Sequence, residues 1–426
     1  MLNNHPRGLR VLFFTEMWER FGFYIMLAVF TLYMDEDLHW DDAHKASVYG
    51  LFLGAVYFIP VAGGWIADRF LGHANTIRIG ALIMVVGYVC LSLSSIDRVP
   101  LFYVALLLIA SGTGLFKANI SVIVGNLYEP GSPLKDTGYN IFYMGVNLGA
   151  FLAPLTATVI HTMLHSYRIS FAAAAGGMVF AIIIFELWRE LYIHADNRQV
   201  SRPLEAAGEV APPMSRSEER QRVVSLGILF AIVIFFWMAF YQNGFALTLF
   251  AQRATVRLDY LQPETYQSFG AGFILLLTPV IVSIFGLLRA RGKEPSSPGK
   301  IFTGMFIAGL SLIIMVFASL AGGNADKNIV SPWWLISSYF VITIAEILVS
   351  PMGLSFVSKV APPRIRGLMM GCWFGATAIG SYSSGLLGRF YGILEHHVYF
   401  ICLGGLLLLS SLLVLVFMKR LKRFTP

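Results

Sequence analysis

Glu16-Met17-Trp18-Glu19-Arg20-Phe21-Gly22-Phe23-Tyr24 carries two acids and an arginine inside an apolar segment that runs from about residue 9 to residue 34. On a helix, Glu16, Arg20 and Tyr24 share one face, with Glu19 beside them. Arg20 lies roughly 16 Å into this segment at about 1.5 Å per residue. That is near the middle of a bilayer core about 30 Å thick, where ionisable groups are costly and commonly functional. The alternative is a neutralised triad that only locks helices together.

The composition indicates a membrane protein that crosses the bilayer many times. Of its 426 residues, 57% are hydrophobic and only 13% are charged, whereas soluble proteins have about 25% charged residues. The net charge of +7 does not require a nucleic-acid partner, because cytoplasmic loops of membrane proteins collect Lys and Arg. The partner that this composition requires is the lipid bilayer.

The sequence offers no sign of a metal site, a cofactor site or an enzyme. Its three cysteines, Cys90, Cys372 and Cys402, all lie in apolar runs, without the spacing of a disulfide framework or a metal site. No nucleophile constellation or phosphate-binding loop is recognisable either. A membrane-embedded enzyme or receptor is therefore disfavoured, and we expect no cofactor.

Apolar runs predict an all-α protein with twelve transmembrane helices. A polar linker at 191–222, rich in Pro, Ala, Glu and Arg, separates two six-helix bundles at 1–190 and 223–426. This 6+6 arrangement with pseudo-symmetric halves is typical of the major facilitator fold. The predicted spans are 9–34, 47–70, 75–96, 100–125, 138–163, 168–190, 223–250, 265–290, 299–321, 332–358, 365–390 and 395–418.

The distribution of basic residues predicts the orientation. Most of the 31 Lys and Arg residues fall in segments that would face the cytoplasm if both termini lie inside. Positive charge in short loops favours the cytoplasmic side. We therefore expect a multi-pass protein of the cytoplasmic (inner) membrane, with both termini in the cytoplasm.

Two further charges lie deep in predicted spans. Lys117 is in the fourth span and Glu346 is in the tenth, and these spans are equivalent elements of a fold built from three-helix repeats. Both spans run from outside to inside, and the two charges lie at a similar depth. We expect Lys117 and Glu346 to pair when the protein is closed to the inside, because an unpaired buried charge is costly.

Several motifs in the right order resemble the proton-dependent oligopeptide transporter family of the major facilitator superfamily. Glu16 to Tyr24 is similar to the family's ExxERFxYY motif, and the stretch from Gly64 to Gly72 resembles the superfamily's loop motif. The remaining resemblances are carried by Lys117-Ala118-Asn119-Ile120-Ser121, by residues 142–150, by residues 346–354 and by Trp373-Phe374. The match covers nearly the whole chain.

The resemblance implies proton-coupled import of di- and tripeptides by alternating access. Arg20 and Lys117 would hold the peptide carboxylate, and Glu346 with Asn147 would hold its amino terminus. Proton coupling would involve Glu16, Glu19, Arg20, Lys117 and Glu346. The remaining residues expected at the substrate site are Tyr24, Tyr57, Trp237, Tyr241, Gln242, Ser350 and Trp373. We expect a monomer whose substrates are peptides and protons.

The chain also departs from the family pattern. Phe23 replaces a motif tyrosine, and Gln267-Ser268 is not followed by the usual Asn-Pro pair. A second reading is therefore a same-fold transporter of another small substrate, such as nitrate or an amino-acid derivative. The charged pair that closes the outer side in the family is replaced by Leu27 and Tyr241, which we expect to pack together. The alternative is that the acidic loop at 35–42 forms another ion pair.

Overall fold

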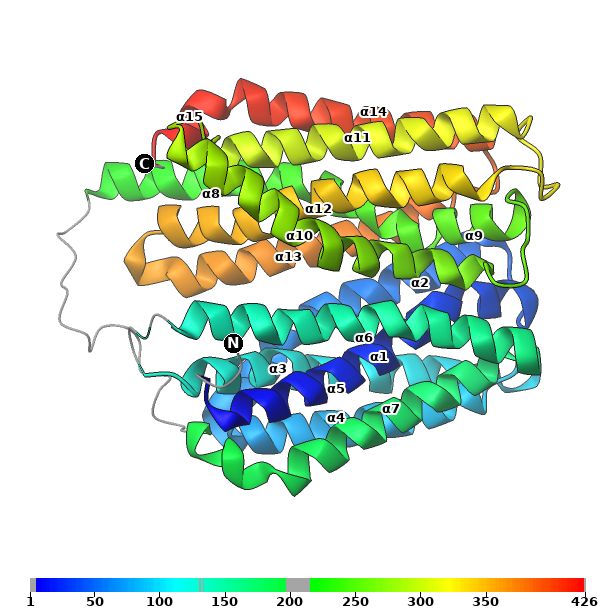
Figure 1. Cartoon of the computed structure of the whole chain (residues 1–426), viewed down its shortest axis with the longest axis horizontal. Helices are drawn as coiled ribbons and strands as arrows, with labels where there is room; N and C mark the ends of the chain where they lie inside the picture. The colour runs from blue at the N-terminus through cyan, green and yellow to red at the C-terminus, as the bar shows by residue number, and fades with distance from the viewer. Residues whose placement is uncertain (1–4, 130–131, 133, 197–214, 425–426) are drawn as a thin grey trace. The chain divides into compact units, whose positions relative to one another are not determined.

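The computed structural model describes residues 5–129, 132, 134–196 and 215–424. These residues form long helices (Figure 1), and within them the only β-pairing is an isolated bridge between Thr255 and Val330. In the described part of the chain, ten helical segments are long and apolar enough to cross a membrane. Two other long helices complete the predicted set: α1 (Arg7–Glu36), which carries the central charges, and α13 (Arg366–Gly388), which is rich in Gly and Ser. The predicted all-α membrane fold is confirmed.

The helices pack into two compact units. Unit 1 comprises residues 1–40, 55–206 and 259–271, and unit 2 comprises 41–54, 207–258 and 272–426. The predicted bundles at 1–190 and 223–426 differ from these units in the segments 41–54 and 259–271, each of which packs with helices of the other half of the sequence. Most of the predicted linker, residues 197–214, lies outside the described residues.

Unit 1 is built on α1, which packs against two later helices through small residues. Gly149 meets the carbonyl of Met17, and a Cβ atom at Gly22 would lie 2.9 Å from the carbonyl of Ala174. Small residues let membrane helices approach closely. The helices of this unit besides α1 are α3 (Pro60–Ile66), α4 (His73–Ser92), α5 (Val99–Asn126), α6 (Leu134–Leu164) and α7 (Tyr167–Leu187).

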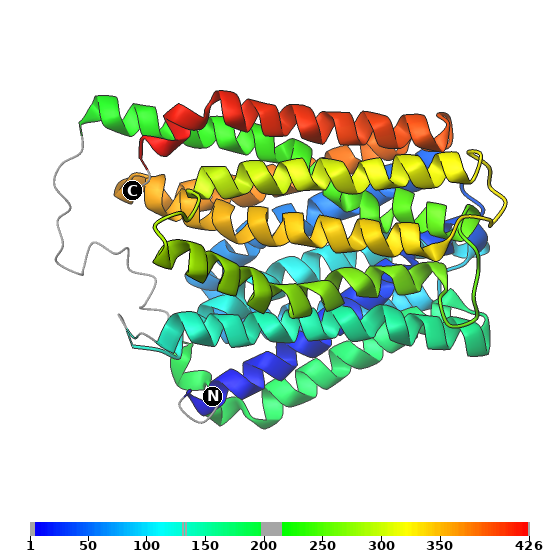
Figure 2. The ribbon, with the colours of Figure 1, turned by 45° about the horizontal axis from the view of Figure 1, so that its top comes forward.

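Unit 2 contains the C-terminal helices and the start of α2 (Asp42–Phe58). Within it, α11 and α14 lie side by side in both views (Figure 1 and Figure 2). The helices of this unit are α8 (Arg216–Phe240), α9 (Ala246–Arg253), most of α10 (Tyr266–Ala290), α11 (Ser297–Ala321), α12 (Pro332–Val360), α13, α14 (His396–Val416) and α15 (Met418–Lys422). The start of α2 packs on α13 at Gly50, where a Cβ atom would lie 2.6 Å from the Cα of Gly385.

The seventh span, predicted at 223–250, is divided in the structure by a turn. A 3-10 turn at Tyr241–Gly244 separates α8 from α9. Gln242 anchors the turn, because its amide donates to the Ser384 carbonyl at 2.8 Å and its side-chain oxygen accepts from the Tyr399 hydroxyl at 2.8 Å. These partners lie more than 140 residues along the chain, so local sequence does not show them.

Candidate functional site

The charged stretch of α1 forms a compact ion cluster in unit 1. Glu16, Glu19 and Arg20 are almost completely buried. The Arg20 guanidinium donates to both carboxylate oxygens of Glu19, with Nη2 lying 2.6 Å from Oε1, and its Nε lies 3.3 Å from Glu16 Oε1. The predicted sharing of one helix face is therefore present. Arg20 thus binds Glu19 through two hydrogen bonds and contacts Glu16 at a longer distance, so Glu16 is the more weakly bound of the two acids.

Two cations of this region, Arg20 and Lys117, each lie over the face of an aromatic ring. The Arg20 guanidinium lies 5.2 Å from the centre of the Phe23 ring, and the Lys117 ammonium lies 4.6 Å from the centre of the Tyr57 ring. Cations over aromatic faces are attracted by the ring quadrupole, more strongly where water is excluded. Within the described residues, no carboxylate lies within ion-pair distance of Lys117. Its ammonium is thus held near the cluster without being neutralised by it.

Two other residues expected at the site, Tyr24 and Asn147, lie on α1 and α6 of unit 1. Tyr24 is half-buried one turn after Arg20 on α1. Asn147 is buried on α6, where its amide donates to the Tyr143 carbonyl at 2.9 Å. The neighbouring Gly149 brings the backbone of α6 against Met17 and Arg20 of α1. Because residues two positions apart on a helix point to different faces, this close approach at Gly149 does not itself bring the Asn147 side chain against the α1 motif.

The expected residues of unit 2 fall into two groups. Trp237, Tyr241 and Trp373 are buried aromatics: the first two stack with ring centres 5.7 Å apart, and Trp373 packs on Gly353. Glu346 and Ser350 are half-buried, one turn apart on α12. Within the described residues the Glu346 carboxylate has neither a hydrogen bond nor an ion pair. Gln242 is occupied by its bonds to Ser384 and Tyr399, so binding a ligand would require one of them to exchange.

Two expected contacts join residues of different units and stay predictions. Lys117 belongs to unit 1 and Glu346 to unit 2, and the same holds for Leu27 and Tyr241. Leu27 is buried, with 8% of its surface exposed.

The acidic loop at the start of α2 supplies an ion pair that the sequence raised only as an alternative. Asp42 accepts two hydrogen bonds from Arg253, at 2.8 and 2.9 Å, and its Oδ1 lies 2.7 Å from Lys45 Nζ. A bidentate arginine–carboxylate pair is strong and directional. Because all three residues belong to unit 2, this pair ties the start of the second span to the end of the seventh.

A second pairing that the sequence analysis missed ties α6 to the start of α10 in unit 1. His161 Nδ1 lies 3.0 Å from Glu264 Oε1, and the hydroxyls of Thr158 and Thr265 are 2.6 Å apart. Glu264 is completely buried. In the sequence, Thr158 and His161 are only two polar residues three positions apart on a helix. This pattern is too common to have indicated the contact.

Comparison with known proteins decides the family. The model of the POT family matches residues 74–201 and 200–393, and a model of MFS/sugar transport proteins matches residues 3–129. The chain belongs to the POT family. It is 31% identical to the uncharacterized transporter YclF of Bacillus subtilis, over 96% of this chain and 94% of that protein. It is 30% identical to the peptide transporter YePEPT of Yersinia enterocolitica, over 90% of this chain and 88% of that protein.

Solved POT structures have the same fold. A crystal structure of a peptide transporter POT in complex with sulfate matches with a TM-score of 0.89 at 30% identity, covering 99% of this chain and 96% of that one. A POT family transporter in complex with 5-aminolevulinic acid matches with a TM-score of 0.86 at 28% identity, covering 98% and 97%. The protein is thus a multi-pass membrane transporter of the POT family, and not an enzyme.

Proposed function

We propose that this POT protein is a proton-coupled symporter that imports di- and tripeptides by alternating access. The observation that carries the proposal is the buried cluster of Glu16, Glu19 and Arg20 in α1, with Lys117 nearby. Both carboxylates contact the same guanidinium, so a proton taken up by one of them weakens its charge-assisted hold on the arginine. A change of protonation in the cluster can therefore change which group the Arg20 guanidinium contacts.

The charge pattern fits a peptide as substrate. A peptide is a zwitterion, and we assign its carboxylate to Arg20 and Lys117 and its amino terminus to Glu346 with Asn147. The support is that both Lys117 and Glu346 lack an ion partner within the described residues. Charge-assisted hydrogen bonds in a low-dielectric site would hold both ends of the peptide. Relatives named as dipeptide and tripeptide permeases, such as permease A of Escherichia coli at 28% identity, support this substrate class.

The proton step acts through Arg20. Protonation of a glutamate from the outside weakens its hold on the guanidinium, which then binds the substrate carboxylate. Release of the peptide and then of the proton to the inside leaves the glutamate ionised and restores the internal pair. Glu19, which holds Arg20 through both of its oxygens, is the acid whose protonation changes the arginine's contacts most. We place the protein in the inner membrane as a monomer with both termini in the cytoplasm. In this orientation the inward proton gradient drives the cycle in the direction of import.

The alternative substrate class is an amino-acid derivative or a small anion such as nitrate. The solved POT transporter that holds 5-aminolevulinic acid supports the first of these. The acid Glu346 disfavours a pure anion carrier.

Uptake into proteoliposomes tests the function. Labelled dialanine is expected to accumulate when the outside is more acidic than the inside and only to equilibrate without a gradient. Unlabelled tripeptide should compete, whereas nitrate should not. Accumulation that ignores the gradient would overturn proton coupling, and competition by 5-aminolevulinic acid but not by tripeptide would overturn the peptide assignment.

A further inference from the structure

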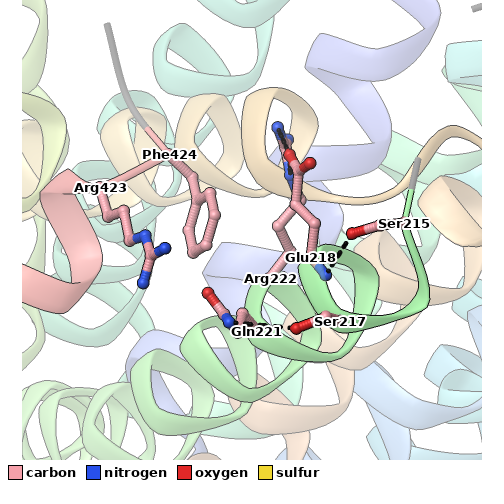
Figure 3. Close-up of a pocket in the computed structure, with 7 residues that line it drawn as sticks. All are labelled: Ser215, Ser217, Glu218, Gln221, Arg222, Arg423 and Phe424. Atoms are coloured by element: carbon pink, nitrogen blue, oxygen red, sulfur yellow. Dashed lines mark hydrogen bonds and ion pairs between the residues drawn. The ribbon is translucent and has the colours of Figure 1, made fainter. Parts of the chain in front are cut away.

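Unit 2 contains a polar cavity of about 620 Å³ between the start of α8 and the end of the described chain (Figure 3). Ser215, Ser217 and Arg222 line it from α8 and the residue before it, and Arg423 and Phe424 line it from the segment after α15. None of these residues belongs to the ion cluster of α1 or to the expected substrate site. The cavity therefore has no role in the function proposed above.

Two arginines flank one aromatic ring in this cavity. The guanidinium carbons of Arg222 and Arg423 lie 5.2 and 5.8 Å from the centre of the Phe424 ring. Arg222 is committed, because it donates to Glu218 at 2.8 Å and to the Val360 carbonyl at 3.3 Å. Within the described residues the Arg423 guanidinium has neither a hydrogen bond nor an ion pair; only its backbone N–H donates, to the Arg420 carbonyl at 3.3 Å. Its donors are therefore available to a ligand of the cavity.

Hydroxyl groups complete the polar lining. The Ser215 side chain accepts from the backbone of Glu218 at 3.2 Å, and that of Ser217 accepts from Gln221 at 3.4 Å. Each hydroxyl acts as an acceptor in these bonds, so its own hydrogen can be donated to another group. Guanidinium and hydroxyl donors around one cavity suit the oxygens of a phosphodiester.

The segments that line the cavity are strongly basic. Between 215 and 222 and between 417 and 424 the acids are Glu218 and Glu219, and the cations are Arg216, Arg220, Arg222, Lys419, Arg420, Lys422 and Arg423. This excess of positive charge favours an anionic ligand over a zwitterionic one. Lysine and arginine side chains near a membrane surface are attracted to anionic lipid.

The cavity also lies where lipid headgroups would be. The apolar part of α8 starts at Val223, directly after Arg222. The apolar α14 ends at Val416, three residues before Lys419, the first basic residue of α15. Val416 is 72% exposed, as expected for a side chain that faces acyl chains. The cavity is thus at the polar end of two spans, beside an apolar surface.

We infer that this cavity binds the headgroup of an anionic glycerophospholipid, with Arg423 and the two serine hydroxyls contacting its phosphodiester. The bound lipid ties the end of the chain to the start of α8. The site needs only a membrane surface at this end of the spans, so it stands or falls separately from peptide transport.

Native mass spectrometry of the purified full chain tests this inference. The protein is released from micelles containing equal amounts of phosphatidylglycerol, phosphatidylethanolamine and phosphatidylcholine, and the bound lipids are counted. Phosphatidylglycerol should be retained in preference, and Arg423→Gln should weaken its retention about tenfold. The matched control is Arg420→Gln, which removes the same charge from α15 without touching the cavity lining. It should change retention little.

Three outcomes would overturn the site. Equal losses in Arg423→Gln and Arg420→Gln would mean a diffuse charge effect, and equal retention of phosphatidylethanolamine would remove the anionic preference. Displacement of the lipid by excess inorganic phosphate would assign the cavity to free phosphate instead. Both variants should unfold at the parent temperature without added lipid, because both arginines are exposed, and phosphatidylglycerol should raise that temperature less for Arg423→Gln.

Discussion

Arg20 is held in position by the close approach of α6 to α1 at Gly149. A Cβ atom at Gly149 would collide with the Met17 carbonyl and would lie 3.2 Å from the Cβ of Arg20. To make room for such a Cβ atom, the backbone of α1 or the Cβ of Arg20 would have to move, and either movement would shift the ion cluster. The glycine is therefore part of what positions the site.

We predict that Gly149→Ala destabilises the protein by about 1–3 kcal/mol, the usual cost of overpacking. The control is Gly176→Ala on α7, where nothing lies within 4 Å of the added methyl group. Thermal unfolding in detergent compares the two. Equal unfolding temperatures for both variants would show that α1 and α6 are not packed as described.

Lys117 and Glu346 are predicted to be essential for transport. Lys117→Ala and Glu346→Ala should each lose nearly all uptake of dialanine, because each removes one of the charges assigned to the peptide ends. Lys135→Ala, on a lysine that is half-buried at the start of α6, serves as the control and should transport normally. Substantial uptake by either deep variant would remove that residue from the proposed site.

At the scale of elements, the bidentate pair of Asp42 and Arg253 fastens the start of α2 to the end of α9. Removal of either side chain takes a partner from a partly buried charge, which costs about 1–3 kcal/mol. We predict that Asp42→Asn and Arg253→Gln each lower the free energy of unfolding by this amount. The double variant should cost less than the sum, because the contact is already lost in either single variant. Additive losses would contradict a direct interaction.

The connection between α10 and α11 is held by Glu294. Hydrogen bonds from Arg289 and Lys300 lower the pKa of Glu294 to about 2. A depressed pKa means that the ionised carboxylate contributes stability above the unfolded-state pKa, about 4.3, and loses it as the pH falls towards 2.

We therefore predict that Glu294→Gln unfolds at a lower temperature than the parent at neutral pH. The difference should shrink as the pH is lowered from about 4 towards 2, where the parent also loses the ionised group. Lys293→Gln, in the same connection, is the control. A difference that stays constant across this range would show that the carboxylate charge is not involved. The effect should be small, because Arg289 is 74% exposed and salt screens such pairs.

At the scale of the whole molecule, the sequence predicts what depends on local periodicity. The apolar runs predicted the spans, and the spacing of Glu16 and Arg20 predicted their contact, because both follow from residues a few positions apart. The break in the seventh span and the pairing of Asp42 with Arg253 depend on residues far apart in the chain. For the latter, one sequence offers a list of possible acids and bases but no way to choose between them.

The account's central claim is that the α1 cluster couples peptide uptake to protons, and Glu19→Gln tests it most directly. Purified parent and variant are compared in proteoliposomes for dialanine uptake under an inward proton gradient and for exchange of dialanine without one. Glu36→Gln, at the C-terminal end of the same helix, is the control and should behave as the parent. We predict that Glu19→Gln fails to concentrate dialanine yet still exchanges it. If Glu19→Gln concentrates dialanine as the parent does, the claim is wrong.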